Sequence, residues 1–198
     1  TRNNITQQIP GGAPFTNEAA GGENYNTLMS LSSSPHDSEV LWAGSDDGLI
    51  HVTQNGGKNW KNVTPKNLKE GIINSIEVSP HIRGKAYVTI MRYKFMDLTP
   101  YVYKTEDYGT SWELITDGIT GKHNFVRVVR ADKKVSGLLY AGTETGFYIS
   151  YDDGNSWEAF QNNLPVVPIN DLYIQDNDLI AATAGRSFWI LDDLSPLQ

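Results

Sequence analysis

The sequence predicts an all-β protein, a β-propeller of about four four-stranded blades that forms part of a larger propeller. One turn motif recurs without gaps at residues 53–60, 105–112 and 150–157, as Ser/Thr-x-Asp/Asn-x-Gly-x-Asn/Ser-Trp. Short apolar strands recur around this motif, and no stretch of the sequence has helical periodicity. A β-sandwich has similar strands but no reason to repeat one turn at one strand junction, so the repeat favours a propeller.

The spacing of the motif fits the length of a propeller blade. Its tryptophans lie 52 and 45 residues apart, and a four-stranded blade takes about 40 to 50 residues. The predicted blades are residues 25–66, 67–120, 121–165 and 166–198. Residues 1–24 are either a linker or contain, at 4–9, a strand that closes the ring. Since about four blades is the lower limit for propellers, we expect missing blades from the same precursor, another chain or a homo-oligomer.

Each blade is expected to run from an inner strand to an outer one. The first strands are expected at 27–31, 74–78, 125–129 and 169–174, second strands at 41–45, 139–143 and 180–184, and third strands at 49–52, 101–103, 146–150 and 187–191. The repeated turn then leads into the fourth strand. In the fourth blade, the Gly-x-x-Trp portion of the motif is missing, and with it the outer strand.

The repeated turn is predicted to be structural. Its Asp or Asn accepts hydrogen bonds from nearby backbone N–H groups, its glycine takes a positive φ, and its tryptophan packs between strands or blades. The residues in these roles are Asn55, Gly57 and Trp60 in the first turn, Asp107, Gly109 and Trp112 in the second, and Asp152, Gly154 and Trp157 in the third.

These turns resemble Asp boxes, the turns of bacterial neuraminidase repeats in sialidases, other glycoside hydrolases and sortilin-like propellers. The resemblance covers roughly residues 25–198. The segment Ala-Gly-Arg-Ser-Phe-Trp-Ile-Leu-Asp-Asp at 184–193 resembles the terminal blade of large bacterial repeat proteins described as sortilin-like or glycosyl-hydrolase-like. The resemblance implies a secreted or periplasmic protein whose ligand site lies on the face opposite the boxes. Asn55 departs from the usual Asp, although an amide still caps a turn.

The search for a site therefore moves to the loops between second and third strands. A glycosidase needs two carboxyl groups, and these loops supply Asp46, Asp97 and Glu144 as catalytic candidates. The candidates for ligand binding are Asp47, Arg92, Tyr93, Lys94 and Arg186. Each candidate also has a structural interpretation, as a turn former, a solvated charge or a packing residue of its loop.

Composition excludes several other classes of function. The net charge of −7 argues against a nucleic-acid partner, and no apolar run approaches the roughly 20 residues needed for membrane insertion. The chain has no cysteine, its four histidines lack the spacing of metal ligands, and no cofactor fingerprint occurs, so we expect neither metal nor cofactor.

Two functions remain. The first is a propeller module that binds a glycan or polypeptide in a central cleft, or that acts as a scaffold within a larger secreted protein. The alternative is a glycoside hydrolase that uses two cleft carboxylates. Sialidase activity is disfavoured, because the resemblance then implies an arginine triad and a Phe/Tyr-Arg-Ile-Pro motif, which is absent here.

Overall fold

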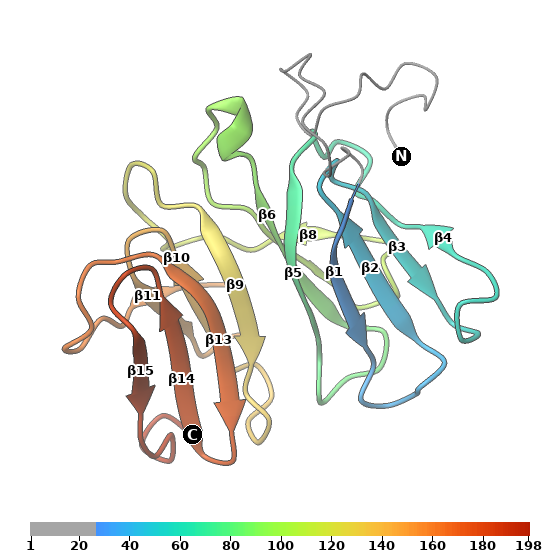
Figure 1. Ribbon diagram of the computed structural model, residues 1–198. Coiled ribbons are helices and arrows are strands. Elements are labelled where there is room, and N and C mark those ends of the chain that lie inside the picture. The colour runs from blue at the N-terminus through green and yellow to red at the C-terminus, as the bar shows by residue number, and fades with distance from the viewer. Residues whose placement is uncertain (1–26) are drawn as a thin grey trace.

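The computed structural model describes residues 27–198 as four antiparallel sheets arranged in an arc (Figure 1). The sheets are blade 1, with β1 (Leu28–Ser33), β2 (Leu41–Ser45), β3 (Ile50–Thr53) and β4 (Lys61–Asn62); blade 2, with β5 (Ile72–Val78), β6 (Ala86–Met91), β7 (Val102–Thr105) and β8 (Glu113–Leu114); blade 3, with β9 (Val126–Ala131), β10 (Leu139–Thr143), β11 (Phe147–Ser150) and β12 (Glu158–Ala159); and blade 4, with β13 (Ile169–Gln175), β14 (Asp178–Thr183) and β15 (Phe188–Leu191). The all-β prediction is confirmed. The segment at 4–9 proposed as a closing strand lies outside the described residues.

Each strand pairs with the next one along the chain, so every blade is a simple meander. The first strands β1, β5, β9 and β13 follow one another along the inner side of the arc, where each contacts its neighbour (Figure 1). Antiparallel pairing places the loops between second and third strands on one face, and the repeated turns between third and fourth strands on the opposite face. The short 3₁₀ helix η2 (Tyr93–Phe95) lies on the first of these faces, which we call the loop face.

The core is divided among the interfaces between blades. One cluster of buried side chains joins blades 1 and 2, a second joins blades 2 and 3, and a third joins blades 3 and 4. Two glycines allow neighbouring blades to approach closely. A Cβ atom on Gly44 would lie 2.3 Å from Cγ2 of Ile73, and one on Gly142 would lie 2.6 Å from Cγ2 of Ile169. These distances explain why the next-to-last residue of the second strand is glycine in blades 1 and 3.

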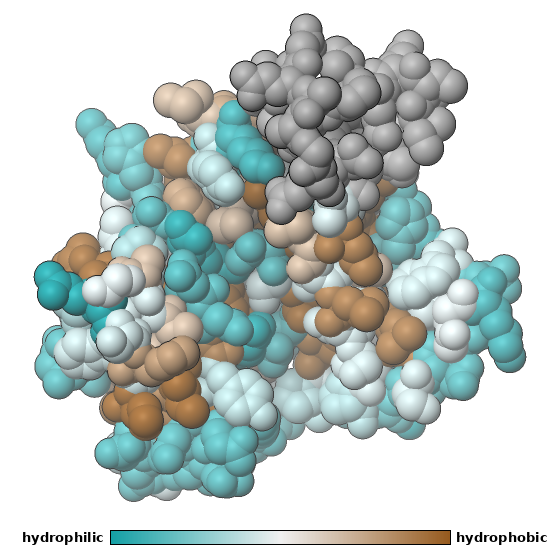
Figure 2. All heavy atoms as spheres, in the orientation of Figure 1, coloured by the Kyte–Doolittle hydropathy of each residue, from teal (hydrophilic) through white to brown (hydrophobic). Residues whose placement is uncertain are grey.

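Blades 1 and 4 form the two ends of the arc. Blade 4 has three strands within the described chain, and its Phe188 and Ile190 are exposed on the side away from blade 3. Leu28 and Leu31 of β1 are likewise exposed at the other end. Figure 2 shows apolar side chains over both ends and hydrophilic side chains between them. Each of these end surfaces corresponds to a surface that is buried between blades elsewhere in the arc.

Candidate functional site

The three repeated turns share one hydrogen-bond pattern. The hydroxyl of Thr53, Thr105 or Ser150 donates to Oδ1 of the third residue at 2.9 Å and accepts from the N–H of the glycine four residues on. The third residue accepts the N–H two residues after this glycine. Hydrogen bonds from Ser111 hold the pKa of Asp107 at about 2, and those from Ser156 lower the pKa of Asp152. These groups are fully occupied within the turn.

The tryptophans of the second and third turns join each blade to the preceding one. The indole N–H of Trp112 donates to the carbonyl of Val63 in blade 1 at 2.7 Å, and that of Trp157 donates to the carbonyl of Ile115 in blade 2 at 3.0 Å. Trp60 is 42% exposed, and no blade within residues 27–198 precedes its own. The tryptophan is therefore a contact between blades.

The fourth residue of the turn is a second contact between blades, one that the sequence analysis missed. Its N–H donates to the turn between first and second strands of the same blade, at 2.9 Å for Tyr108, 2.8 Å for Asp153 and 2.7 Å for Leu194. The three side chains pack or bond at the interface with the preceding blade. Because they are an aromatic, an acid and an aliphatic residue, the alignment of the turns gives no signal for this position.

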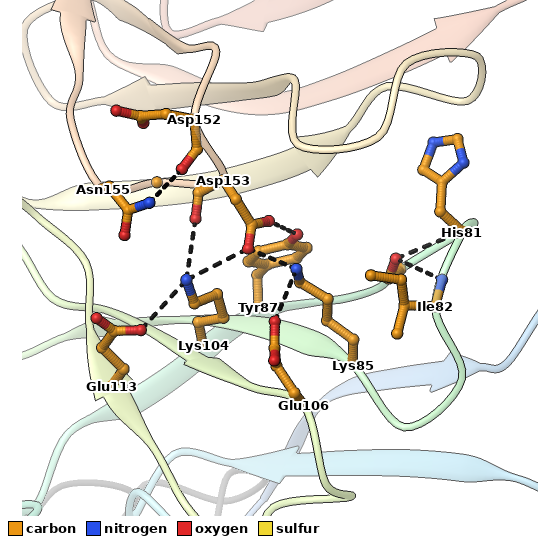
Figure 3. A network of polar contacts seen from close by, with 12 residues as sticks. His81, Ile82, Lys85, Tyr87, Lys104, Glu106, Glu113, Asp152, Asp153 and Asn155 are labelled. Atoms are coloured by element: carbon orange, nitrogen blue, oxygen red, sulfur yellow. Dashed lines mark hydrogen bonds and ion pairs between the residues drawn. The ribbon is translucent and has the colours of Figure 1, made fainter.

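Asp153 forms the polar version of this contact (Figure 3). Its carboxylate accepts hydrogen bonds of 2.5 Å from Nζ of Lys85 and from the hydroxyl of Tyr87, and it lies 3.3 Å from Nζ of Lys104. Burial alone would raise the pKa of Asp153, but Lys85, Tyr87 and the charge of Lys104 outweigh it and lower the pKa. Every titratable group of this cluster is paired, so the cluster joins blades 2 and 3 and leaves no group for chemistry.

On the loop face, the two aspartates of blade 1 make different contacts. Asp46 is 8% exposed and accepts the N–H of Thr27 at 2.8 Å. Asp47 is completely buried and accepts the hydroxyl proton of Ser45. The bond from Ser45 supports the turn-forming interpretation of Asp47, whereas Asp46 links the loop to the residue that precedes β1.

Arg92 and Asp97 brace the long loop of blade 2. The Arg92 guanidinium, which is largely buried, donates to the carbonyl of Glu70 at 2.8 Å and forms an ion pair with Asp97. Asp97 also accepts the hydroxyl proton of Tyr101 at 2.9 Å. The loop thereby holds Tyr93 at the surface, 42% exposed, with half-buried Lys94 beside it.

Tyr93 lies at the edge of a hollow between blades 2 and 3. This hollow, of about 530 Å³, is lined by Met91, Tyr93, Leu98, His123, Phe125, Arg127 and Glu144. The Tyr93 and Phe125 rings stack with centroids 5.9 Å apart and an interplanar angle of 23°. Arg127 lies over the Phe125 ring at 5.2 Å and donates from Nε to Glu144 at 2.7 Å. We call this feature the aromatic hollow.

The aromatic hollow brings together two of the candidates from the sequence, Tyr93 and Glu144, and leaves the others outside. Arg186 is exposed in the loop between β14 and β15 of blade 4 and does not line it. The three catalytic candidates Asp46, Asp97 and Glu144 lie in three different blades. Phe125 and Arg127 were missed, because they fall at the start of a first strand, where a core or channel role is expected.

A second depression runs along the inner side of the arc, between β1, β5, β9 and β13, and measures about 370 Å³. Arg130 crosses it, donating to the carbonyl of Leu172 at 2.8 Å, to Ser75 at 2.9 Å and to Asp171 at 2.6 Å. Glu77 lies 3.6 Å from the same guanidinium, and burial raises the pKa of Glu77 despite this charge. Arg130 therefore connects blades 2, 3 and 4 beside this inner groove.

Within residues 27–198, no three or more histidine and acidic side chains gather as metal ligands do, and no helix has the length and hydrophobicity to span a membrane.

Comparison with known proteins gives a match at the level of fold. No family model and no curated protein matches the chain. Among solved structures, YCF48 bound to D1 peptide is 19% identical, with a TM-score of 0.63 over 84% of this chain and 52% of that chain. The chain is a β-propeller segment. An ancestral GH74 enzyme (19% identity, TM-score 0.65) and the GH74 xyloglucanase of Xanthomonas campestris (14%, 0.65) match over 85% of this chain but 24% and 28% of theirs. The segment thus spans about half, or a quarter, of these propeller proteins.

Proposed function

We propose that this propeller segment is a polypeptide-binding module and that its ligand occupies the aromatic hollow. The stacked pair of Tyr93 and Phe125 carries the proposal, because it presents an aromatic surface that stays accessible at its Tyr93 edge. Binding pockets commonly combine such apolar surfaces with a few placed polar groups. Arg127 and Glu144 supply those groups at the rim.

The lining of the aromatic hollow favours a peptide over a glycan. Met91, Leu98 and Phe125 offer contacts suited to an apolar side chain. Arg127 and Glu144 neutralise each other, so the rim gives no strong preference for a charged ligand. The neighbour YCF48 is described as bound to a D1 peptide, which supports peptide binding as a use of this fold.

The GH74 neighbours support glycoside hydrolysis as the second candidate function, but with a different pair of carboxylates from those first considered. Among the carboxylates first considered, Asp46 is bonded to the backbone of Thr27, and Asp97 and Glu144 form ion pairs with arginines. Glu77, with its raised pKa, and exposed Asp171 share Arg130 beside the inner groove. A general acid of raised pKa near a second carboxylate is what a glycosidase requires.

The repeated turn also suggests the type of protein to which the module belongs. We propose that the three turns are Asp boxes of the bacterial neuraminidase repeat and sortilin-like type, in a secreted or periplasmic protein. The exposed ends of the arc support further blades as partners, from the same precursor, another chain or a homo-oligomer. Scaffolding within such a protein is compatible with peptide binding.

The experiment is a peptide-array screen with the chain, followed by calorimetry on the strongest peptide. Tyr93→Ala is expected to weaken binding at least about tenfold, because it removes the exposed aromatic surface. Arg186→Ala is the matched control, an exposed loop-face residue outside the hollow, and is expected to leave binding unchanged. Binding to glycans alone, or turnover of a polysaccharide that Glu77→Gln abolishes, would overturn the proposal.

A further inference from the structure

The interface between blades 3 and 4 contains a pocket with a mostly apolar lining. Its lining includes Phe147, Phe160, Leu179, Ala181, Trp189 and Leu191. The pocket lies beside β15, which pairs with β14 on one edge and has no partner strand on its other edge within residues 27–198. An open strand edge offers unpaired N–H and C=O groups to another strand.

The position of Phe160 in the repeat shows what such a pocket holds. Val63, Ile115 and Phe160 are equivalent, because each follows the fourth strand of its blade and donates its N–H, at 2.9 Å, to the first residue of the third strand. The carbonyls of Val63 and Ile115 accept the indole N–H of a tryptophan from the next blade. In the described chain, no tryptophan donates to the carbonyl of Phe160.

The strand register shows where a tryptophan equivalent to Trp157 would lie in blade 4. Trp157 directly precedes β12 and lies opposite Ser150, whose partner on the second strand is Leu139. In blade 4 the equivalent pair is Leu179 and Leu191. A residue opposite Leu191 on an added strand would therefore face blade 3, as Trp157 faces blade 2, and both members of this pair line the pocket.

The chain after β15 does not fill this position. Leu194 is the equivalent of Asp153, since its N–H donates to the turn between β13 and β14, and it is fully buried against blade 3. Leu194 thus occupies the place of the fourth turn residue. The pocket lies at the place of the tryptophan, which is four residues further along the motif.

We propose that the free edge of β15 and this pocket form a docking site for an extended strand of a second polypeptide, which inserts a tryptophan into the pocket. Main-chain hydrogen bonds to β15 would supply affinity, and the tryptophan would supply specificity by packing on Phe147 and Trp189 and donating to the carbonyl of Phe160. This site lies apart from the aromatic hollow, so it goes beyond the proposed function.

The chain provides its own probe for this site. A synthetic peptide with the sequence of residues 154–161, Gly-Asn-Ser-Trp-Glu-Ala-Phe-Gln, carries the tryptophan and outer strand of blade 3. Titrated into the full chain, it is expected to shift the backbone amide resonances of residues 188–191 in nuclear magnetic resonance spectra. The same peptide with Trp replaced by Ala is expected to bind at least about tenfold more weakly.

Two variants of the protein form a matched pair. Ala181 lines the pocket, whereas Ala182 pairs with Phe188 and faces away from blade 3. Ala181→Leu is expected to fill the pocket and weaken peptide binding at least about tenfold, while Ala182→Leu leaves it unchanged. Equal binding of the Trp and Ala peptides, or shifts confined to other sites, would overturn the proposal. If Ala181→Leu perturbs folding, the comparison of the Trp and Ala peptides on the unsubstituted protein still tests the proposal.

Discussion

The carboxylate of Asp153 in blade 3 accepts a hydrogen bond of 2.5 Å from the ammonium group of Lys85 in blade 2. Lys85 is 4% exposed and Lys104 is 8% exposed, and the half-buried carboxylate of Asp153 is the counter-charge that both ammonium groups share, whereas exposed Glu106 and Glu113 pair with one lysine each. Burying an ammonium group without a partner is costly. The stability of the interface between blades 2 and 3 therefore depends on one residue at a position where the repeat has no consensus.

Asp153→Asn is expected to lower the free energy of unfolding by about 2–4 kcal/mol, because an amide cannot neutralise the two buried lysines. Urea unfolding followed by fluorescence measures this change. Glu113→Gln is the control, since Glu113 also pairs with Lys104 but is 61% exposed at its side chain. The control should cost no more than about 1 kcal/mol. If both variants lose the same stability, Asp153 is not the central partner of the cluster.

The tryptophans of the repeat are expected to differ in their contribution. Trp157 is 3% exposed and bonded to Ile115, so Trp157→Phe should destabilise the protein by about 1–3 kcal/mol through the lost hydrogen bond and the smaller ring. Trp60→Phe should change stability by less than about 0.5 kcal/mol, because Trp60 is 42% exposed and not packed between two blades of the described chain. Thermal unfolding of the two variants measures the difference. A large loss for Trp60→Phe would mean that this residue has a contact outside the described chain.

Acid should weaken the repeated turns within a defined pH range. The pKa of Asp107 is held at about 2, and that of Asp152 is also lowered, by hydrogen bonds within the turn. A carboxyl group with a depressed pKa contributes stability above its unfolded pKa of about 3.9, and this contribution is lost as the pH falls through the folded value. We expect stability to decline from about pH 4 towards about pH 2. Asp107→Asn should flatten this decline, since Asn55 closes the first turn with an amide. An unchanged decline would contradict this assignment.

Features of the fold that follow from local sequence patterns could be predicted, whereas features that follow from contacts between blades could not. Strand alternation and the repeated turn are local patterns, so the four blades, and the three strands that blade 4 has within residues 27–198, could be predicted. The turn also indicated its own structural roles, and Trp112 and Trp157 do pack at the interface between blades. These features can be predicted without knowing which blades contact one another.

The candidate site depends on contacts between blades, which are difficult to predict from the sequence. Phe125 and Arg127 alternate along the start of a first strand, and the binding role proposed for them rests on their proximity to Tyr93 and Glu144. Conversely, Asp47 stands out in the sequence as an acidic loop residue, but a neighbouring serine and complete burial commit it to the turn. The loop charges indicated the loop face, and among the charged candidates only Glu144 lines the hollow.

Glu77 is expected to respond to pH in the opposite direction to the aspartates. Burial raises its pKa above the unfolded value of about 4.3, so its contribution to stability is greatest below that value and is lost as the pH rises through the folded pKa. Glu77→Gln retains an oxygen for the N–H of Ala131 and removes the titration. The stability of this variant relative to the unsubstituted protein should therefore increase from about pH 4 to about pH 7, as measured by urea unfolding at several pH values. A relative stability that falls over this range would show that the Arg130 ion pair outweighs burial, and that Glu77 lacks the raised pKa a general acid needs.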